Sequence, residues 1–200
     1  MPKLLKTIKI EGKIKTKSGL HIGGMKESFK IGGVDNPVIR IKIGENELPY
    51  IPGSSIKGKI RCLLELEKGK DKPCDCNNCE ICMIFGSDGK DKSITRAIFR
   101  DAYIINSLGE DTEIKPENRI DRITSKAEHP RFIERILPEK EFYQEIILNI
   151  FEGDNEKELL KVLKHGFELL EKSYLGGSGT RGYGKVDVSD IIKNIEEKLK

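Results

Sequence analysis

The chain has 200 residues, of which 36% are hydrophobic and 34% are charged, and its formal net charge is +3. This length suits one domain with a substantial core, and so small a net charge does not by itself indicate a nucleic-acid binder. No apolar stretch approaches the length of a membrane span, and the first residues lack the apolar core of a secretory signal. We therefore expect a cytoplasmic protein without a membrane partner, whose five cysteines are reduced or metal-bound.

Apolar patterning predicts an alternation of strands and helices along the chain. Core strands are predicted at residues 5–15, 97–104, 142–151 and 183–188. Stripes of helical spacing predict long helices at residues 55–67 and 155–174, and a short helix that ends the chain. Ser54 or Ser55 can cap the first helix, Asn155 can cap the second, and Gly176 fits its stop position.

The order strand, helix, strand, strand, helix, strand indicates an α+β fold of the ferredoxin-like, RNA-recognition type, with a βαββαβ core. Such a fold packs its helices on one face of an antiparallel sheet and leaves the other face free, where RNA-recognition domains bind RNA. We expect one domain, residues 1–200, with insertions at about 19–52, 69–95 and 112–140. The last of these is charged and weakly periodic, which favours a hairpin that projects from the core.

A glycine run lies between the second long helix and the last strand, in the sequence LGGSGTRGYGKV. Glycine loses the most backbone entropy in a helix or strand, so this run favours a loop whose bare backbone approaches something closely. Its amides, with the flanking cations, suit a phosphate or an RNA backbone. A flexible surface loop would have the same composition. The residues concerned are Gly176, Gly177, Gly179, Arg181, Gly182, Gly184 and Lys185.

Basic residues gather in three further places: the first seventeen residues with six lysines, residues 57–61, and residues 119–135. Separate patches of this kind can converge into one anion track, although solvated surface is their commoner meaning. The sequence PGSSIKGKIR at 52–61 begins a helix, where free amides, the serine hydroxyls, Lys57 and Arg61 could hold a phosphate. An ordinary capped surface helix is the alternative interpretation.

The cysteines give the most specific chemical signal. Four of them fall within nine residues, in PCDCNNCEIC, as Cys74, Cys76, Cys79 and Cys82. Four thiolates at this spacing can surround one tetrahedral ion, and zinc fits better than an iron–sulfur cluster because the ferredoxin spacing is absent. Such a site would be structural, and His21 or His129 could replace one ligand. The fifth, Cys62, is expected in the core.

Isolated polar residues carry weaker signals. His21, in SGLHIGG, is either a hydrogen-bonded structural group or a residue with a direct role in RNA contact or catalysis. Asp35 lies in IGGVDNPVIR, where turn formation is the simplest explanation and binding of a divalent ion is the functional one. Asp101, in FRDA, is a similar lone candidate on a strand. Glu117, Asp121 and Glu134 in the projecting segment are others, each most simply a solvated charge.

Taken together, these stretches resemble one family, the repeated backbone subunit of type III-A CRISPR effector complexes, within the RAMP superfamily. The resemblance covers nearly the whole chain, in order. It rests on GLHIGG, IGGVDNPVI, IPGSSIKGKIR, IFG, IFRDA, ENRIDRIT, HPRFIER and YLGGSGTRGYGKV.

The resemblance implies a modified RNA-recognition fold whose copies stack along a guide RNA, together with other type III-A subunits. It implies that the projecting segment is a thumb that kinks the duplex of guide and target RNA, and that the target is cut beside it with Mg²⁺ or Mn²⁺. The family's essential acid falls on Asp35. Guide-RNA contacts fall on His21, Ser54, Lys57, Arg61, Arg119, Arg122 and the glycine run with Arg181. The cysteine cluster would be a zinc-binding insertion that only some relatives have.

Other functions remain open at this level. The chain could be an RNA scaffold that does not cut, or a metal-independent endonuclease that processes the guide with His21 as general base. A nucleotide-binding enzyme is a more distant alternative, because the glycine run follows a helix instead of opening one.

Overall fold

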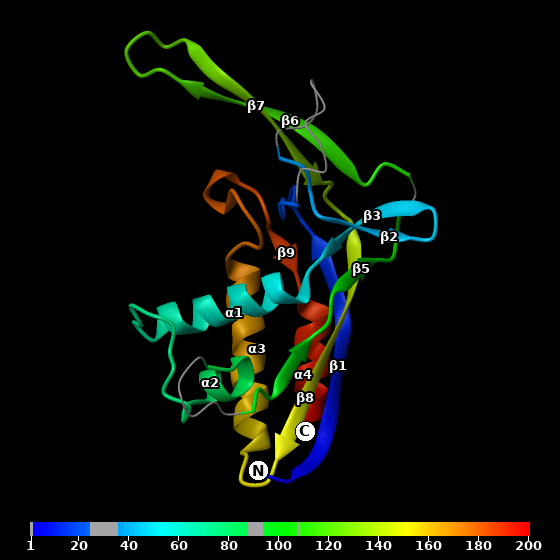
Figure 1. Ribbon diagram of the computed structural model, residues 1–200, viewed down its shortest axis with the longest axis vertical. Coiled ribbons are helices and arrows are strands. Elements are labelled where there is room, and N and C mark those ends of the chain that lie inside the picture. Colours follow the sequence, from blue (N-terminus) through cyan, green and yellow to red (C-terminus); the bar gives the residue numbers. More distant parts are fainter. Residues whose placement is uncertain (1, 25–35, 88–93, 108) are drawn as a thin grey trace.

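The computed structural model describes residues 2–24, 36–87, 94–107 and 109–200, and Figure 1 shows a sheet with helices on one side and a hairpin projecting from one end. The strands are β1 (Leu4–Thr16), β2 (Arg40–Ile43), β3 (Asn46–Ile51), β4 (Ala97–Phe99), β5 (Ala102–Ile104), β6 (Thr112–Ile120), β7 (Ala127–Ile136), β8 (Glu141–Phe151) and β9 (Val186–Asp187). The helices are α1 (Gly53–Glu67), α2 (Glu80–Phe85), α3 (Glu156–Lys172) and α4 (Ser189–Leu199).

The long strands β1 and β8 form the centre of an antiparallel sheet. They pair from Lys6 opposite Ile150 to Lys15 opposite Glu141. The sheet runs in the order β2-β3-β5-β8-β1-β9, and β4 also pairs with β8. Two predicted strands differ from the structure. Residues 97–104 form two short strands instead of one. Of the strand predicted at 183–188, only β9 forms, because Gly184 belongs to the preceding loop, where its carbonyl accepts from the Leu175 amide.

The core lies between the sheet and the helices. Alternate residues of β1 and β8 point inward, so that the pattern read from the sequence becomes a buried face, while α1, α3 and α4 close it from the other side. Fully buried representatives are Ile10, Ile14, Phe142, Ile146, Ile60, Leu163, Phe167 and Ile191. None of the described helices is long and apolar enough to span a bilayer.

The predicted capping of α1 is wrong, whereas that of α3 is confirmed. Pro52 is the N-cap of α1, and its side chain makes no capping hydrogen bond. The carboxylate of Asp101 accepts from the Gly53 amide at 2.8 Å instead. Asp101 is therefore a helix cap supplied by the β4–β5 connection. Asn155 caps α3 by accepting from the Glu158 amide at 3.3 Å, and α3 ends at Lys172, before Gly176.

The segment 112–140 contains the expected hairpin. Strands β6 and β7 pair from Thr112 opposite Ile136 to Ile120 opposite Ala127, with an irregularity between Glu117 and Arg119. The turn is closed by Asp121, whose carboxylate accepts from the Ile123 and Thr124 amides. Figure 1 shows this hairpin, called the thumb below, leading away from the sheet.

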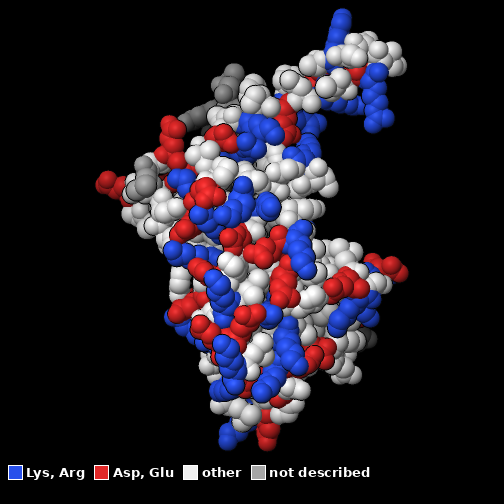
Figure 2. Space-filling model, turned by 180° about the vertical axis from the view of Figure 1, so that it is seen from behind, with Lys and Arg blue, Asp and Glu red and all other residues white. Residues whose placement is uncertain are grey.

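The open face of the sheet differs from the expected RNA platform. Five of the six N-terminal lysines that formed a basic cluster in the sequence pair with carboxylates, as in Lys9 with Glu11 at 2.6 Å and Lys13 with Glu141 at 2.9 Å. Figure 2 shows positive and negative side chains interspersed over the body. Because phosphates would compete with these carboxylates, the N-terminal lysines do not form an anion track.

A glycine inside α3 sets how closely α1 can approach. A Cβ at Gly166 would lie 2.4 Å from Cγ2 of Ile60. Overpacking costs about 1–3 kcal/mol, whereas alanine gains about 1 kcal/mol over glycine in a helix. We expect Gly166→Ala to lower the free energy of unfolding in urea by about 1 kcal/mol. The control is Gly58→Ala in α1, where nothing lies within 4 Å and a gain is expected. Equal gains for both variants would contradict this packing argument.

Candidate nucleic-acid interface and metal centre

The glycine loop, residues 176–184, lies directly against the segment around His21. The Gly177 amide donates to the His21 carbonyl at 2.8 Å, and the Gly184 amide donates to the Gly19 carbonyl at 2.9 Å. Gly176 has φ +74°, and a Cβ there would lie 2.3 Å from the His21 carbonyl oxygen. Only glycine fits this position, so the run packs as a defined loop instead of a free surface tether.

His21 connects the glycine loop to the thumb. Its Nδ1 lies 2.7 Å from the carbonyl oxygen of Glu134 on β7. Because a carbonyl can only accept, the proton in this bond is on Nδ1, and the neutral ring then has an acceptor at Nε2. His21 is half-buried at this junction.

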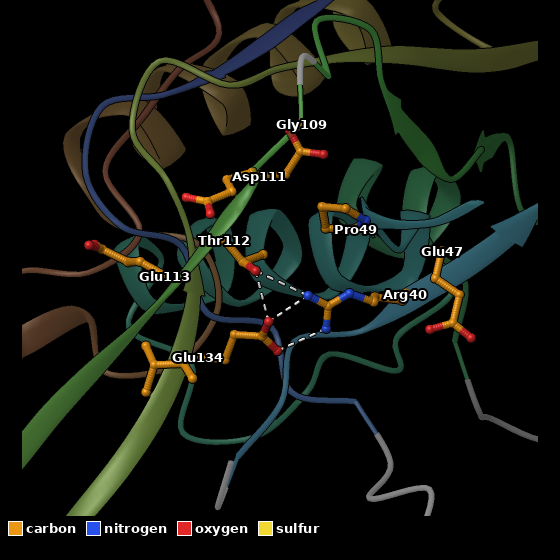
Figure 3. A pocket seen from close by; sticks show the side chains of 10 residues that line it. Arg40, Glu47, Pro49, Gly109, Asp111, Thr112, Glu113 and Glu134 are labelled. Carbon is orange, nitrogen blue, oxygen red and sulfur yellow. Dashed lines mark hydrogen bonds and ion pairs between the residues drawn. The ribbon is translucent and has the colours of Figure 1, made fainter. Parts of the chain in front are cut away.

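Glu134 forms the base of the thumb and is not the solvated charge expected from the sequence. It is buried, and its carboxylate takes two hydrogen bonds from Arg40, at 2.9 and 2.5 Å. The Val38 amide at 2.9 Å and the Thr112 hydroxyl at 2.8 Å complete its shell, as Figure 3 shows for Arg40 and Thr112. The thumb is therefore fixed to β2 by a bidentate ion pair between the buried Glu134 and the half-buried Arg40, with further donors.

Asp35 lies outside the described residues, but the residue after it is placed. The carbonyl of Asn36 accepts from the Glu134 amide at 3.1 Å, and Asn36 forms a parallel bridge with Ile133 on β7. The described chain therefore resumes with Asn36 at the base of the thumb.

The cations of α1 have different surroundings. Burial, followed by repulsion from Arg61, lowers the pKa of Lys57, and no carboxylate pairs with Lys57 in the part of the chain that the structure describes. Lys59 lies over the Tyr174 ring, 3.6 Å from its centroid, and Gly179 packs against that same ring. The helix thus borders the glycine loop and presents Lys57 as a cation that no described carboxylate pairs with. Ser54 is exposed in its first turn.

Arg61 does not extend freely from α1. Its Nε donates to Glu65 at 2.9 Å and its Nη2 to the Cys74 carbonyl at 2.7 Å. Glu65 also accepts from the Cys74 amide at 2.9 Å. Arg61 therefore holds the cysteine cluster against α1, a structural role that the predicted contact with guide RNA did not foresee.

The remaining predicted arginines lie on the thumb and the loop. Arg119 and Arg122 are exposed near the thumb tip, where Ile123 is 93% exposed. Arg181 is 55% exposed, and it pairs with Glu117 of the thumb at 3.2 Å and donates to the Ser178 hydroxyl at 2.6 Å. The structure thus brings His21, the glycine loop and the thumb base together, with Lys57 on the adjoining helix, while Arg119 and Arg122 stand apart on the tip.

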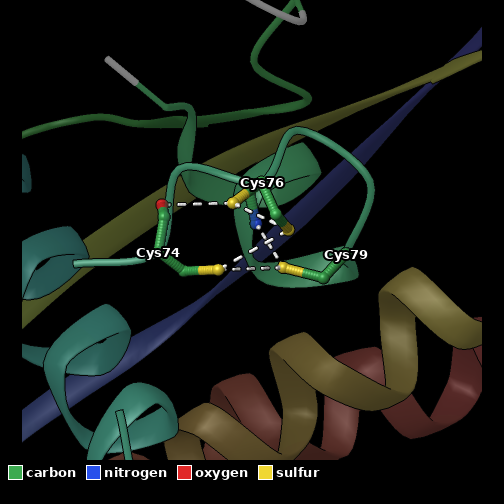
Figure 4. A group of neighbouring side chains, drawn as sticks. Cys74, Cys76 and Cys79 are labelled. Atoms are coloured by element: carbon green, nitrogen blue, oxygen red, sulfur yellow. Dashed lines mark hydrogen bonds between the residues drawn. The ribbon is translucent and has the colours of Figure 1, made fainter. Parts of the chain in front are cut away.

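The four clustered cysteines form one compact group, shown in part in Figure 4. All four sulfur atoms lie within 4.8 Å of one another, and three sulfur pairs are 3.5, 3.8 and 3.9 Å apart. A hydrogen bond from the Asn78 backbone lowers the pKa of Cys76 to about 6, whereas burial raises the pKa of Cys82 to about 12. This group could hold a metal. Cys62 is exposed, so its expected place in the core is wrong.

Comparison with known proteins identifies the family. The RAMP superfamily matches residues 13–187. The chain belongs to the RAMP superfamily. A Methanocaldococcus jannaschii protein named CRISPR system Cms endoribonuclease Csm3 is 48% identical over 91% of this chain and 78% of its own length. A Streptococcus thermophilus protein of the same name is 46% identical over 90% of this chain and 86% of its own.

A solved structure agrees with this assignment. A chain in the Csm3–Csm4 subcomplex of the type III-A CRISPR-Cas interference complex has a TM-score of 0.60 and 36% identity, covering 92% of this chain and 76% of that chain. The resemblance to the type III-A backbone subunit is therefore confirmed, and this chain is a RAMP protein of the Csm3 group.

Sequence reasoning missed the RAMP protein's connecting residues. Glu134 and Arg40 are 94 residues apart, so no local pattern joins them. Glu117, expected to be solvated, accepts from the Tyr183 hydroxyl at 2.7 Å. Tyr183 lies inside the glycine run, and a large aromatic ring among glycines was the one sequence signal that this loop packs against another part of the protein.

Removal of the Glu134 charge should destabilise the fold in a pH-dependent way. Burial alone would raise the pKa of Glu134, but the hydrogen bonds from Arg40, Val38 and Thr112 outweigh burial and lower it from 4.5. The stabilisation is therefore fully present above about pH 4.5 and disappears as the pH falls through the lower, folded-state pKa.

We expect Glu134→Gln to lose about 2 kcal/mol of unfolding free energy at neutral pH, because the half-buried Arg40 and the other donors would lose their hydrogen bonds to an ionised group. In urea titrations the difference from the wild type should shrink below about pH 4.5. Glu139→Gln, on the exposed Lys15 pair, is the control and should change little. A loss that stays constant down to pH 3 would contradict the ionic explanation.

Proposed function

We propose that this chain binds guide RNA in a type III-A CRISPR interference complex and cuts the complementary target RNA beside its thumb with a divalent metal. The observation that carries the proposal is the junction of glycine loop, His21 and thumb base, where three segments distant in sequence meet through backbone contacts. The comparisons support it, because the relatives are named endoribonucleases and one structural neighbour belongs to the interference complex.

The core topology supports an RNA-recognition type of fold. The strands β9, β1, β8 and β5 lie side by side in that order, while α1 and α3 follow the first and third of the core strands β1, β4/β5, β8 and β9. This order supports a ferredoxin-like βαββαβ unit, to which β2, β3, α2 and the thumb would be additions. RNA then binds at the loop and thumb side, since the open sheet face is occupied by paired charges.

Guide RNA would lie along the glycine loop, with each group contributing in a different way. Gly182, beside which nothing lies within 4 Å, would allow a sugar-phosphate chain to approach the backbone, and Lys57 supplies a cation without an acidic partner in the described part of the chain. The Nε2 acceptor of His21 suits a ribose hydroxyl. Arg119 and Arg122 on the exposed tip would meet the phosphates of the target duplex.

Cleavage would depend on Asp35, which is joined to Asn36 at the thumb base. A carboxylate there would hold Mg²⁺ or Mn²⁺, and the metal would stabilise charge on the cut phosphate. The thumb would flip a target nucleotide out of its stack and so leave that backbone free for in-line attack.

The same complex tests the catalytic role. Asp35→Ala in an assembled complex should slow metal-dependent cutting of complementary RNA by at least about a hundredfold, while guide RNA still co-purifies. Asp190→Ala, an exposed acid of α4, is the control and should cut normally. Equal cutting by both variants would remove Asp35 from the mechanism. Cutting of precursor RNA in EDTA would favour the guide-processing alternative, and guide binding without any cutting would favour the scaffold.

We also propose that the four cysteines bind one structural zinc ion. Thiolates about 2.3 Å from zinc in a tetrahedron are about 3.8 Å from one another, and the three sulfur pairs at 3.5, 3.8 and 3.9 Å fit this edge. The ion would hold residues 74–82 against α1 through the Arg61 and Glu65 bonds.

Metal content gives the test of the zinc site. Purified wild type should contain one equivalent of zinc by elemental analysis, and Cys82→Ser should lose most of it, because a buried ligand is removed. Cys62→Ser replaces an exposed thiol outside the cluster and should keep the ion. Equal zinc content in both variants would contradict the assignment.

A further inference from the structure

Tyr183 of the glycine loop is anchored in the thumb. It is only 2% exposed, and its hydroxyl donates to Oε1 of Glu117 on β6 at 2.7 Å. The other oxygen of Glu117 pairs with Arg181 at 3.2 Å. The loop therefore binds one carboxylate of the thumb through two side chains, a tyrosine and an arginine that are two residues apart in the sequence.

Two cations of the thumb also lie against the tyrosine ring. Lys115 is 4.8 Å and Arg135 is 5.1 Å from the ring centroid. They come from β6 and β7, so the ring contacts both strands of the hairpin. Contacts of cations with a buried aromatic face are attractive and depend on direction. The ring therefore holds the hairpin in one orientation and does more than fill space.

The titration of both partners keeps the hydrogen bond intact at neutral pH. Burial, followed by the carboxylate of Glu117, raises the pKa of Tyr183 to about 12, so that its hydroxyl keeps the proton. The hydrogen bond from Tyr183 lowers the pKa of Glu117, so that its carboxylate stays ionised. Donor and acceptor thus have the states that the geometry requires.

The contact lies where the thumb leaves the body. Glu117 is half-buried, and the pairing of β6 with β7 becomes irregular directly after it. The residues at 118–132 are exposed, apart from the half-buried Asp121 in the turn. Figure 1 shows this outer part of the hairpin extending beyond the body. A small rotation at Glu117 would therefore move the tip through a large arc.

We propose that Tyr183 and Glu117 are positioning residues for target cleavage, which set the angle of the thumb tip relative to the guide phosphates that the glycine loop holds. This inference rests on the proposed function. The loop that grips the guide and the thumb that enters the duplex are then coupled through one side-chain contact. The contact fixes which target nucleotide the tip displaces, and hence which phosphate lies beside the metal.

The test uses the complete complex reconstituted with guide RNA and a complementary RNA that carries 2-aminopurine at the wild-type cut position. In Tyr183→Phe we expect unchanged guide-RNA content and cutting slower by about ten- to a hundredfold, since small misplacements have effects of this size. We also expect cuts spread over neighbouring phosphates and less 2-aminopurine fluorescence, because the base is flipped less often. A purely structural role would not change the cut position.

Matched variants separate the causes. Tyr143→Phe removes a similar bond, from Tyr143 to Glu11 at 2.6 Å on the open sheet face, and should keep both rate and cut position. Glu117→Gln keeps an acceptor for Tyr183 and should keep the cut position. The double variant Tyr183→Phe/Glu117→Ala should be no worse than Glu117→Ala alone, because both changes remove the same contact.

Three outcomes would overturn the inference. Tyr183→Phe could cut the same phosphates at the wild-type rate, which leaves the proposed function intact but removes this role. It could fail to join the complex while Glu117→Ala joins and cuts the wild-type phosphates at the wild-type rate, which makes the tyrosine structural. If the wild-type complex itself holds no guide or cuts no target, the proposed function fails first, and this inference fails with it.

Discussion

The described structure depends on the approach of bare backbone at Gly176 and Gly177 to the carbonyl of His21. The Gly177 amide lies 2.8 Å from that oxygen, and a side chain at Gly176 would occupy the same space. His21 in turn meets the Glu134 carbonyl, and the Glu134 amide meets Asn36. The glycine loop, the thumb and the chain that follows Asp35 therefore belong to one network of hydrogen bonds. A Cβ at Gly176 would push the glycine loop away from the His21 carbonyl and so weaken the other hydrogen bonds of this network.

The thumb base is held by charged groups, whereas most of the core is held by apolar contacts. Charged hydrogen bonds depend on direction, and apolar contacts do not. Burial of apolar surface is non-directional, and it would allow a narrow hairpin to rock on the body. The bidentate contact of Arg40 with Glu134 has a fixed geometry, and the Val38 amide and the Thr112 hydroxyl satisfy the carboxylate further. A partly buried ion pair of this kind contributes little net stability, because both charges lose water. Its role here is to give the hairpin one orientation, which Tyr183 then reinforces from the loop side.

The sequence predicts those parts of the fold in which neighbours along the chain decide the outcome. The alternation in β1 and β8, the stripe and cap of α3, and the projecting hairpin were all expected and are present. Prediction failed where the deciding partner is distant. Asp101 caps α1 from another element, and Arg40 pairs with Glu134 across 94 residues. For the candidate site, composition indicated the glycine loop and the cysteine group, but it could not show that Arg61 braces the latter.

If the chain binds RNA as proposed, the partition of charge explains how a net charge of only +3 is sufficient. Lysines of β1 are matched by carboxylates on the sheet face, so phosphates there would gain little from them. Lys57, Arg119 and Arg122 have no ion pair among the residues that the structure describes, and all three lie on the loop and thumb side. Each phosphate that such a cation neutralises releases counterions, which is the main source of RNA affinity. A small number of such cations would give one copy only weak, salt-sensitive binding. Copies stacked along a single guide would raise the effective concentration for each further contact. Under the proposed function, modest affinity per subunit is therefore consistent with a stable assembly, provided that every copy presents its loop and thumb in the same orientation.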